Sequence, residues 1–140
     1  MMSMRLSLVV FGAVALLAGC ATAKKAEPAP DFVTLAGRVV TTDAAPLPAD
    51  AVVTVRLLDV SWPDEPPKVL AEQSLAQPGN PPVAFTLRYR PSEAERGHRF
   101  VLDARIEFSG RLRYYSTASQ PVRLDGMDGA QELVVAPANR

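Results

Sequence analysis

The chain has 140 residues, 48% of them hydrophobic, which is enough for one domain with a buried core and too few for a second domain. Fifteen basic residues balance fifteen acidic ones, which argues against electrostatic binding to nucleic acid or to an anionic bilayer. Thirteen prolines against eight glycines indicate short strands with stiff connections rather than a helical bundle.

The first twenty residues have the composition of an export signal. Arg5 is the only charged residue among them, and the run that follows, residues 6–17, is apolar or small except for Ser7. This run is shorter than the roughly 20 residues of a membrane-spanning helix. We therefore expect residues 1–19 to be a signal peptide, cleaved between Gly19 and Cys20.

The end of this segment, Leu17-Ala18-Gly19-Cys20, resembles the lipobox of bacterial lipoproteins. The resemblance implies that the Cys20 sulfur is acylated through a thioether and that Cys20 becomes the new N-terminus. The alternative is an ordinary secretory peptide cleaved near Ala21-Thr22-Ala23. Cys20 is also the only cysteine, so no internal disulfide can form.

Lipid on Cys20 would make the bilayer the first partner of this chain, because two or more acyl chains hold a protein firmly in a membrane. Ala21 stands where the sorting rule of Gram-negative lipoproteins places Asp for retention in the inner membrane. We therefore expect the periplasmic face of the outer membrane. Residues 20–31 are polar and contain proline, which indicates a flexible tether between the lipid and a domain over residues 32–137.

Apolar residues recur at every second position along the whole domain, which is the pattern of half-buried strands. Ser109-Gly110 marks a hairpin turn, and the proline-rich segments 63–67 and 77–82 mark loops. Ser92 and Glu95 have capping-box spacing, but Gly97 limits that helix to a single turn. The expected strands cover residues 33–41, 53–57, 69–75, 83–89, 100–108, 111–117, 122–124 and 132–135.

The faces of these strands are assigned from the same alternation. Val69 is expected to point inward with Ala71 and Leu75, and Leu112 with Tyr114. The sequence thus predicts an all-β fold, an antiparallel β-sandwich or small barrel of seven to eight strands, preceded by a helical signal peptide and a flexible linker.

Few residues are spaced like those of a catalytic or metal-binding site. His98 is the only histidine, so we expect no zinc site, no other metal site and no cofactor. Ser61, His98 and Asp103 could form a Ser-His-Asp set, but no nucleophile elbow accompanies them. We expect no catalytic residues. For His98 we favour a structural position at the start of a strand that follows a turn.

Polar residues on apolar faces need hydrogen-bond partners, so Asp59 and Gln73 are either a small binding site or structural. We favour a structural role for both: Asp59 caps the loop 60–67, and Gln73 forms a hydrogen bond to a neighbouring strand. Trp62 either covers one end of the core, which we favour, or is an exposed contact. Seven arginines form either an anion-binding face or, as we favour, cross-strand ion pairs: Arg56, Arg88, Arg90, Arg99, Arg105, Arg111 and Arg113.

Several segments of the domain carry a family resemblance: Ala51–Ser61, Ala71–Gln73, Pro82 to Tyr89, His98–Phe100, Ala104–Ile106 and Gly110–Leu112. Together they resemble the YbaY family of bacterial lipoproteins, which shares a domain with the YscW-type pilotins of type III secretion. The resemblance implies a β-sandwich on a lipid anchor, and in the pilotin branch the escort of a secretin to the outer membrane. The expected function is a non-enzymatic, periplasm-facing lipoprotein that binds a protein or envelope component, with a secretin pilotin as the alternative.

Overall fold

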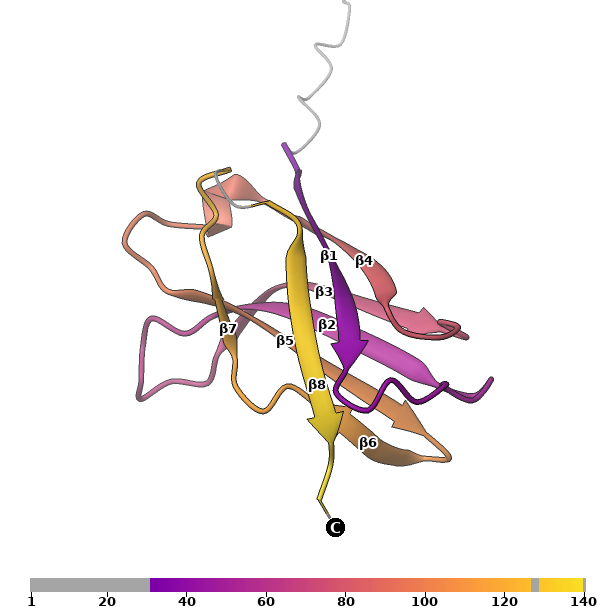
Figure 1. Ribbon diagram of the computed structural model, residues 1–140. Coiled ribbons are helices and arrows are strands. Elements are labelled where there is room, and N and C mark those ends of the chain that lie inside the picture. Colours follow the sequence, from indigo (N-terminus) through magenta and orange to yellow (C-terminus); the bar gives the residue numbers. More distant parts are fainter. Residues whose placement is uncertain (1–30, 127–128, 140) are drawn as a thin grey trace, which may run out of the picture.

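The computed structural model describes residues 31–126 and 129–139, which form eight strands and one short 3₁₀ helix (Figure 1). This confirms the predicted all-β fold. Within that part of the chain no helix is long and apolar enough to cross a membrane. The elements are β1 (Val33–Thr41), β2 (Val52–Asp59), β3 (Lys68–Ala76), β4 (Val83–Tyr89), η1 (Pro91–Glu93), β5 (Phe100–Phe108), β6 (Arg111–Tyr115), β7 (Gln120–Val122) and β8 (Gln131–Pro137).

The predicted signal peptide, residues 1–19, and all but Asp31 of the predicted tether, residues 20–31, lie outside the described residues. The same holds for Gly19 and Cys20. The cleavage site and the lipidation site therefore stay predictions.

The strands form one strongly curved sheet in the order β3-β2-β5-β6-β8-β1-β4, with β7 added beside β5. The sheet is nearly closed into a barrel, with β3 and β4 at its two ends (Figure 1). All pairs are antiparallel except β1 with β8. A parallel pair needs a long connection, and here almost the entire domain separates the two strands, so local sequence gave no sign of it.

The core fills the inside of this curved sheet, and period-two alternation decides which side chains enter it. Strand β4 alternates strictly between buried and exposed residues, and Leu102 and Ile106 of β5 are fully buried. Fully burying side chains of this size contributes about 1.5–3 kcal/mol each. The predicted inward faces of 83–89 and 100–108 are confirmed.

Two bulges change which side chains point inward. The register of β2 with β3 shifts between Leu57 and Leu58, so Leu70 is buried while Val69 is 48% exposed. A second shift, in the register of β5 with β6, leaves Arg113 of β6 unmatched, and Leu112 is exposed while Tyr114 stays buried. The inward placements predicted for Val69 and Leu112 were wrong, because one extra residue in a strand moves its neighbours to the opposite face.

Several element boundaries also differ from the prediction. Strand β7 ends at Val122 rather than covering 122–124, and β6 ends at Tyr115. The single helical turn is confirmed, but it is a 3₁₀ turn that begins at Pro91 and lacks a side-chain cap, so the Ser92 capping box does not form. Proline at the first position of the turn supplies the required backbone angle instead.

Gly37 is a point of close approach between β1 and its neighbours. A Cβ atom there would collide with the Gln131 carbonyl oxygen and would lie 2.6 Å from Cζ of Phe85, its cross-strand partner. The Phe85 ring is 2% exposed, so it fills the space that a side chain at position 37 would need.

Replacing Gly37 by Ala should lower the free energy of unfolding by about 1–3 kcal/mol, because the core must shift to admit the extra carbon. Urea unfolding followed by circular dichroism measures this. Gly129→Ala is the matched control, since nothing lies within 4 Å of a Cβ at that position. Equal stability of the two variants would contradict the close packing described here.

Candidate functional site

The candidate site lies at the end of the barrel where β2 and β4 finish and β5 begins. Three connections meet there: the loop after β2, the η1 segment between β4 and β5, and the segment after β7. The chain also enters the domain at this end, because Val33 pairs with Tyr89 just before η1. Phe32 packs under the guanidinium groups of Arg88 and Arg90, at 4.6 and 5.5 Å from its ring centre.

A buried carboxylate organises this end. Asp59 is the last residue of β2 and only 4% exposed. Its Oδ1 accepts hydrogen bonds from the Ser61 backbone N–H at 2.9 Å and from the Ser61 hydroxyl at 2.5 Å, and its Oδ2 lies 2.7 Å from Nδ1 of His98. The Ser61 hydroxyl oxygen in turn accepts the Arg99 backbone N–H at 2.8 Å. The loop after β2 is thereby fixed to the start of β5.

Burial alone would raise the pKa of Asp59, because the charged form loses contact with water. The hydrogen bonds from Ser61 and His98 outweigh that effect, and the pKa of Asp59 lies below its usual value. His98 also has its Nε2 3.4 Å from a Glu95 carboxylate oxygen. Asp59 is therefore an ionised, fully bonded group at neutral pH, which suits a structural role.

This arrangement confirms that Asp59 caps the loop after β2. It differs from a Ser-His-Asp triad, in which the serine hydroxyl bonds to the imidazole. Here the Ser61 hydroxyl donates to the carboxylate and Nε2 of His98 faces Glu95. The predicted third member, Asp103, lies on the outer face of β5 and pairs with Arg56.

Sequence reasoning missed the pairing of Asp59 with His98. The signal was the register of β2 with β5, in which Asp59 stands opposite Phe100, two residues after His98. These strands are about forty residues apart, so local spacing did not reveal the contact. Within residues 31–126 and 129–139, no three His, Cys, Asp or Glu side chains form a group that could hold a metal ion.

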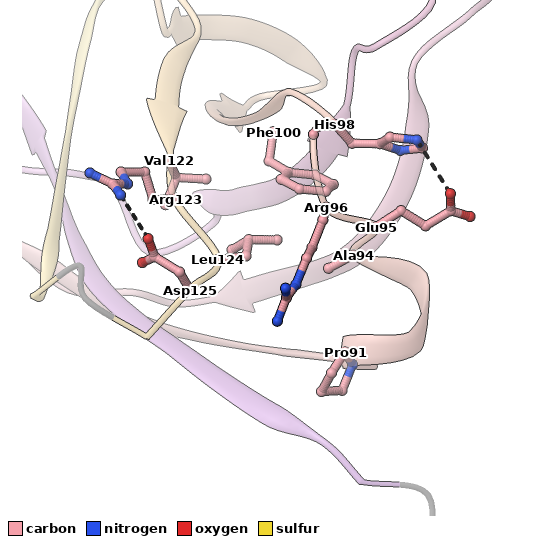
Figure 2. Close-up of a pocket in the computed structure, with 11 residues that line it drawn as sticks. Pro91, Ala94, Glu95, Arg96, His98, Phe100, Val122, Arg123, Leu124 and Asp125 are labelled. Atoms are coloured by element: carbon pink, nitrogen blue, oxygen red, sulfur yellow. Dashed lines mark ion pairs between the residues drawn. The ribbon is translucent and has the colours of Figure 1, made fainter.

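A groove of about 510 Å³ opens beside this cluster (Figure 2). One wall is the η1 segment through His98, and the other is the segment after β7. Phe100 and Val122 are buried at its base, and Ala94 and Leu124 are partly buried against the core. The lining residues are Pro91, Ala94, Glu95, Arg96, Gly97, His98, Phe100, Val122, Arg123, Leu124 and Asp125.

The rim of the groove is charged. Arg123 pairs with Asp125 at 2.9 Å on one wall, and Glu95 faces His98 on the other. Figure 2 shows the Arg96 side chain between Leu124 on one wall and Pro91 on the other. An apolar base with a few charged groups at the edge suits an apolar side chain of a peptide whose flanking residues are polar.

The remaining candidates have structural partners. Arg56 makes a two-point bond to Asp103, at 3.0 and 2.6 Å, which confirms a cross-strand ion pair and raises the Arg56 pKa. The other arginines do not share one pattern: Arg88 and Arg90 contact Phe32, Arg113 lies over Phe108, and Arg99 donates to the Val60 carbonyl.

The structure also decides the roles of Gln73 and Trp62. The Gln73 side-chain carbonyl accepts a hydrogen bond from the Thr86 backbone N–H at 2.8 Å, which confirms the predicted bond to a neighbouring strand. Trp62 is 50% exposed and lies edge-on to His98, with 4.6 Å between ring centres. The prediction that Trp62 covers one end of the core was therefore wrong, because Asp59 bonds to both Ser61 and His98 and so holds this loop beside the His98 ring.

Replacing Asp59 by Asn should lower the free energy of unfolding at pH 7 by about 1–3 kcal/mol, the usual loss for hydrogen bonds to a charged group. Because folding lowers the pKa of Asp59, its ionised carboxylate stabilises the fold at pH values above the unfolded-state pKa. This stabilisation is lost as the pH falls through the folded-state pKa. The gap between wild type and variant should therefore close below about pH 4. Thermal unfolding from pH 7 to pH 3 measures it, with the exposed Asp64→Asn as control. A gap that is constant with pH would contradict an ionised Asp59.

Known proteins resemble this chain over nearly all of the domain. Residues 30–135 match the family model of the type III secretion system lipoprotein chaperone YscW. The uncharacterised lipoprotein YbaY of Escherichia coli K12 is 32% identical over 115 residues, covering 81% of this chain but only 60% of YbaY. An alternative pilotin from the type II secretion system of Vibrio cholerae superposes with a TM-score of 0.73 at 29% identity, over 79% of this chain and all of that one. Because this family model spans most of the chain, the chain belongs to the YscW family.

Proposed function

We propose that this protein is a lipid-anchored envelope protein whose β-domain binds a segment of another envelope protein in the groove beside His98. The observation that carries the proposal is the groove itself, with buried Phe100 and Val122 at its base and charged residues at its edge. Binding rather than catalysis is favoured because the Ser61 hydroxyl is directed to Asp59 and not to an imidazole base.

The anchor in this proposal is an acylated Cys20, formed after cleavage between Gly19 and Cys20. Support comes from the Leu17-Ala18-Gly19-Cys20 sequence and from relatives described as lipoproteins. Ala21 favours the periplasmic face of the outer membrane as the location. Residues 21–31 reach at most about 40 Å when extended, so the domain stays near the bilayer.

The position of the groove supports a role at the membrane surface. The chain enters the domain at Asp31 and Phe32, beside Arg90 and Pro91, and Pro91 is also part of the groove wall. An anchored domain therefore holds the groove at the end from which its tether leaves. A partner captured there is held close to the membrane.

A secretin pilotin is the second candidate. The likeness to a type II secretion pilotin and to the type III secretion chaperone family favours it. In this version the groove receives a short segment of an outer-membrane secretin, with apolar side chains at helical spacing on its base. Deleting the gene should then leave secretin subunits unassembled. Normal secretin multimers in the deletion strain would exclude the pilotin version while leaving the envelope-binding version intact.

Replacing Cys20 by Ala should abolish acylation and release the protein from the membrane, because the domain has no other anchor in this proposal. The measurement is metabolic labelling with an alkyne fatty acid, followed by fractionation of the envelope. Ala21→Asp is the matched control: it keeps the label and moves the protein to the inner membrane. Continued membrane association of the Ala variant without label would contradict the anchor.

Partner binding in the groove is tested by a photocrosslinking amino acid at position 96 in intact cells. We expect discrete adducts from position 96 and none from position 111, an exposed arginine at the start of β6 that does not line the groove. Leu124→Glu should reduce the adducts at least 10-fold, because it places a charge at the apolar base. Equal adducts from positions 96 and 111 would count against the groove as the binding site.

A further inference from the structure

Arg96 is the only charged side chain of the groove lining that has no partner among the described residues. Glu95 on the same wall faces His98 at 3.4 Å, and Arg123 on the opposite wall pairs with Asp125 at 2.9 Å. Figure 2 draws these two ion pairs and none to Arg96. Its guanidinium group makes no hydrogen bond within the described part of the chain either. The groove therefore holds one guanidinium group that no described carboxylate engages.

A tight turn fixes the backbone that carries Arg96. The His98 backbone N–H donates to the Glu95 carbonyl at 3.2 Å, and Gly97 has a φ of 85°. A positive φ is what the third position of a type II turn requires. His98 is itself bonded to the buried Asp59. Arg96, at the second position of this turn, thus projects from a wall that is already held in place before a ligand binds, which lowers the entropy cost of binding.

The Arg96 side chain lies next to the apolar part of the groove. It is exposed and lies between Leu124 and Pro91 (Figure 2), in the groove whose base is formed by buried Phe100 and Val122. A guanidinium group is weakly hydrated and presents a planar fork of donors that matches a carboxylate. A ligand that covered the apolar base without a carboxylate would take water away from this charge and leave it unpaired. Charge complementarity therefore favours a ligand that is both apolar and acidic.

The geometry points to the chemistry by which the partner is recognised: we infer that the groove binds a peptide segment in which an acidic side chain lies beside an apolar one. The apolar side chain packs on Phe100 and Val122, and the carboxylate pairs with Arg96. The two side chains must share one face of the segment, so they are two residues apart in an extended peptide and three or four apart in a helix. This inference rests on the proposed function and adds the specificity of the same groove.

The test uses the full-length lipoprotein in detergent micelles and a phage-displayed library of random dodecapeptides. Peptides selected by the wild type should be enriched in Asp or Glu at a fixed spacing from a large apolar residue. The same selection on Arg96→Glu should enrich Lys or Arg at that position, because the variant reverses the charge. Arg111→Glu is the matched control: it makes the same change at an exposed arginine outside the groove and should select acidic peptides.

A selected peptide, synthesised with its acidic residue either intact or replaced by the amide, gives the size of the effect. Arg96→Gln should weaken binding of the acidic peptide roughly 2- to 5-fold, as expected for a partly exposed ion pair, and leave binding of the amide peptide unchanged. Added salt should reduce the difference between the two peptides, because dissolved ions screen an exposed pair. Leu124→Glu should weaken binding of both peptides, since it places a charge at the apolar base.

The outcomes separate this inference from the proposed function. Urea unfolding verifies that each variant is folded. If Leu124→Glu weakens peptide binding but Arg96→Glu leaves the preference for acidic residues unchanged, the inference is overturned and the groove remains a binding site. If no peptide is selected, or if Leu124→Glu has no effect on those that are, both proposals fail. Tighter binding of oleate than of any selected peptide would assign the groove to a fatty acid and would also overturn the inference.

Discussion

The pairing of β2 with β5 is the interaction on which the rest of this structure depends. Val53, Val55 and Leu57 stand opposite Ile106, Ala104 and Leu102, and all six are nearly inaccessible to solvent. This pair supports β3 on one side and β6 and β7 on the other. Its register also places Asp59 beside the start of β5, so the same contact that builds the core brings His98 to the buried carboxylate.

The end of that pair near Asp59 shapes the groove. The cap on the loop and the bond to His98 fix one wall of the groove, while the segment after β7 supplies the other. Polar groups there are satisfied internally, which leaves an apolar base with a charged edge for a ligand. A buried carboxylate with all its bonds made therefore serves the groove by holding its wall in place.

The unclosed sheet is a separate feature of the same fold. Seven strands in sequence around the barrel leave β3 and β4 as its ends, and a glutamine side chain rather than a ladder connects them. Exposed edges favour unwanted pairing, and proteins usually protect them with charges and prolines. Pro78, Pro81 and Pro82 lie in the loop at one end of this seam and Lys68 begins β3, so residues of this protective kind stand at the ends of the unpaired strands.

The sequence by itself determined the all-β class, the inward faces of β4 and β5, and the structural roles of Asp59 and Gln73. These follow from period-two alternation and from the need of buried polar groups for partners, which are local properties. The cleavage at Gly19 and the lipid on Cys20 are predictions of the same local kind. Only the tertiary structure decided the parallel pair of β1 with β8, the two bulges that expose Val69 and Leu112, and the contact of Asp59 with His98. Each of these depends on register between strands that are far apart in the chain or on one inserted residue, and neither leaves a mark in local hydrophobic spacing.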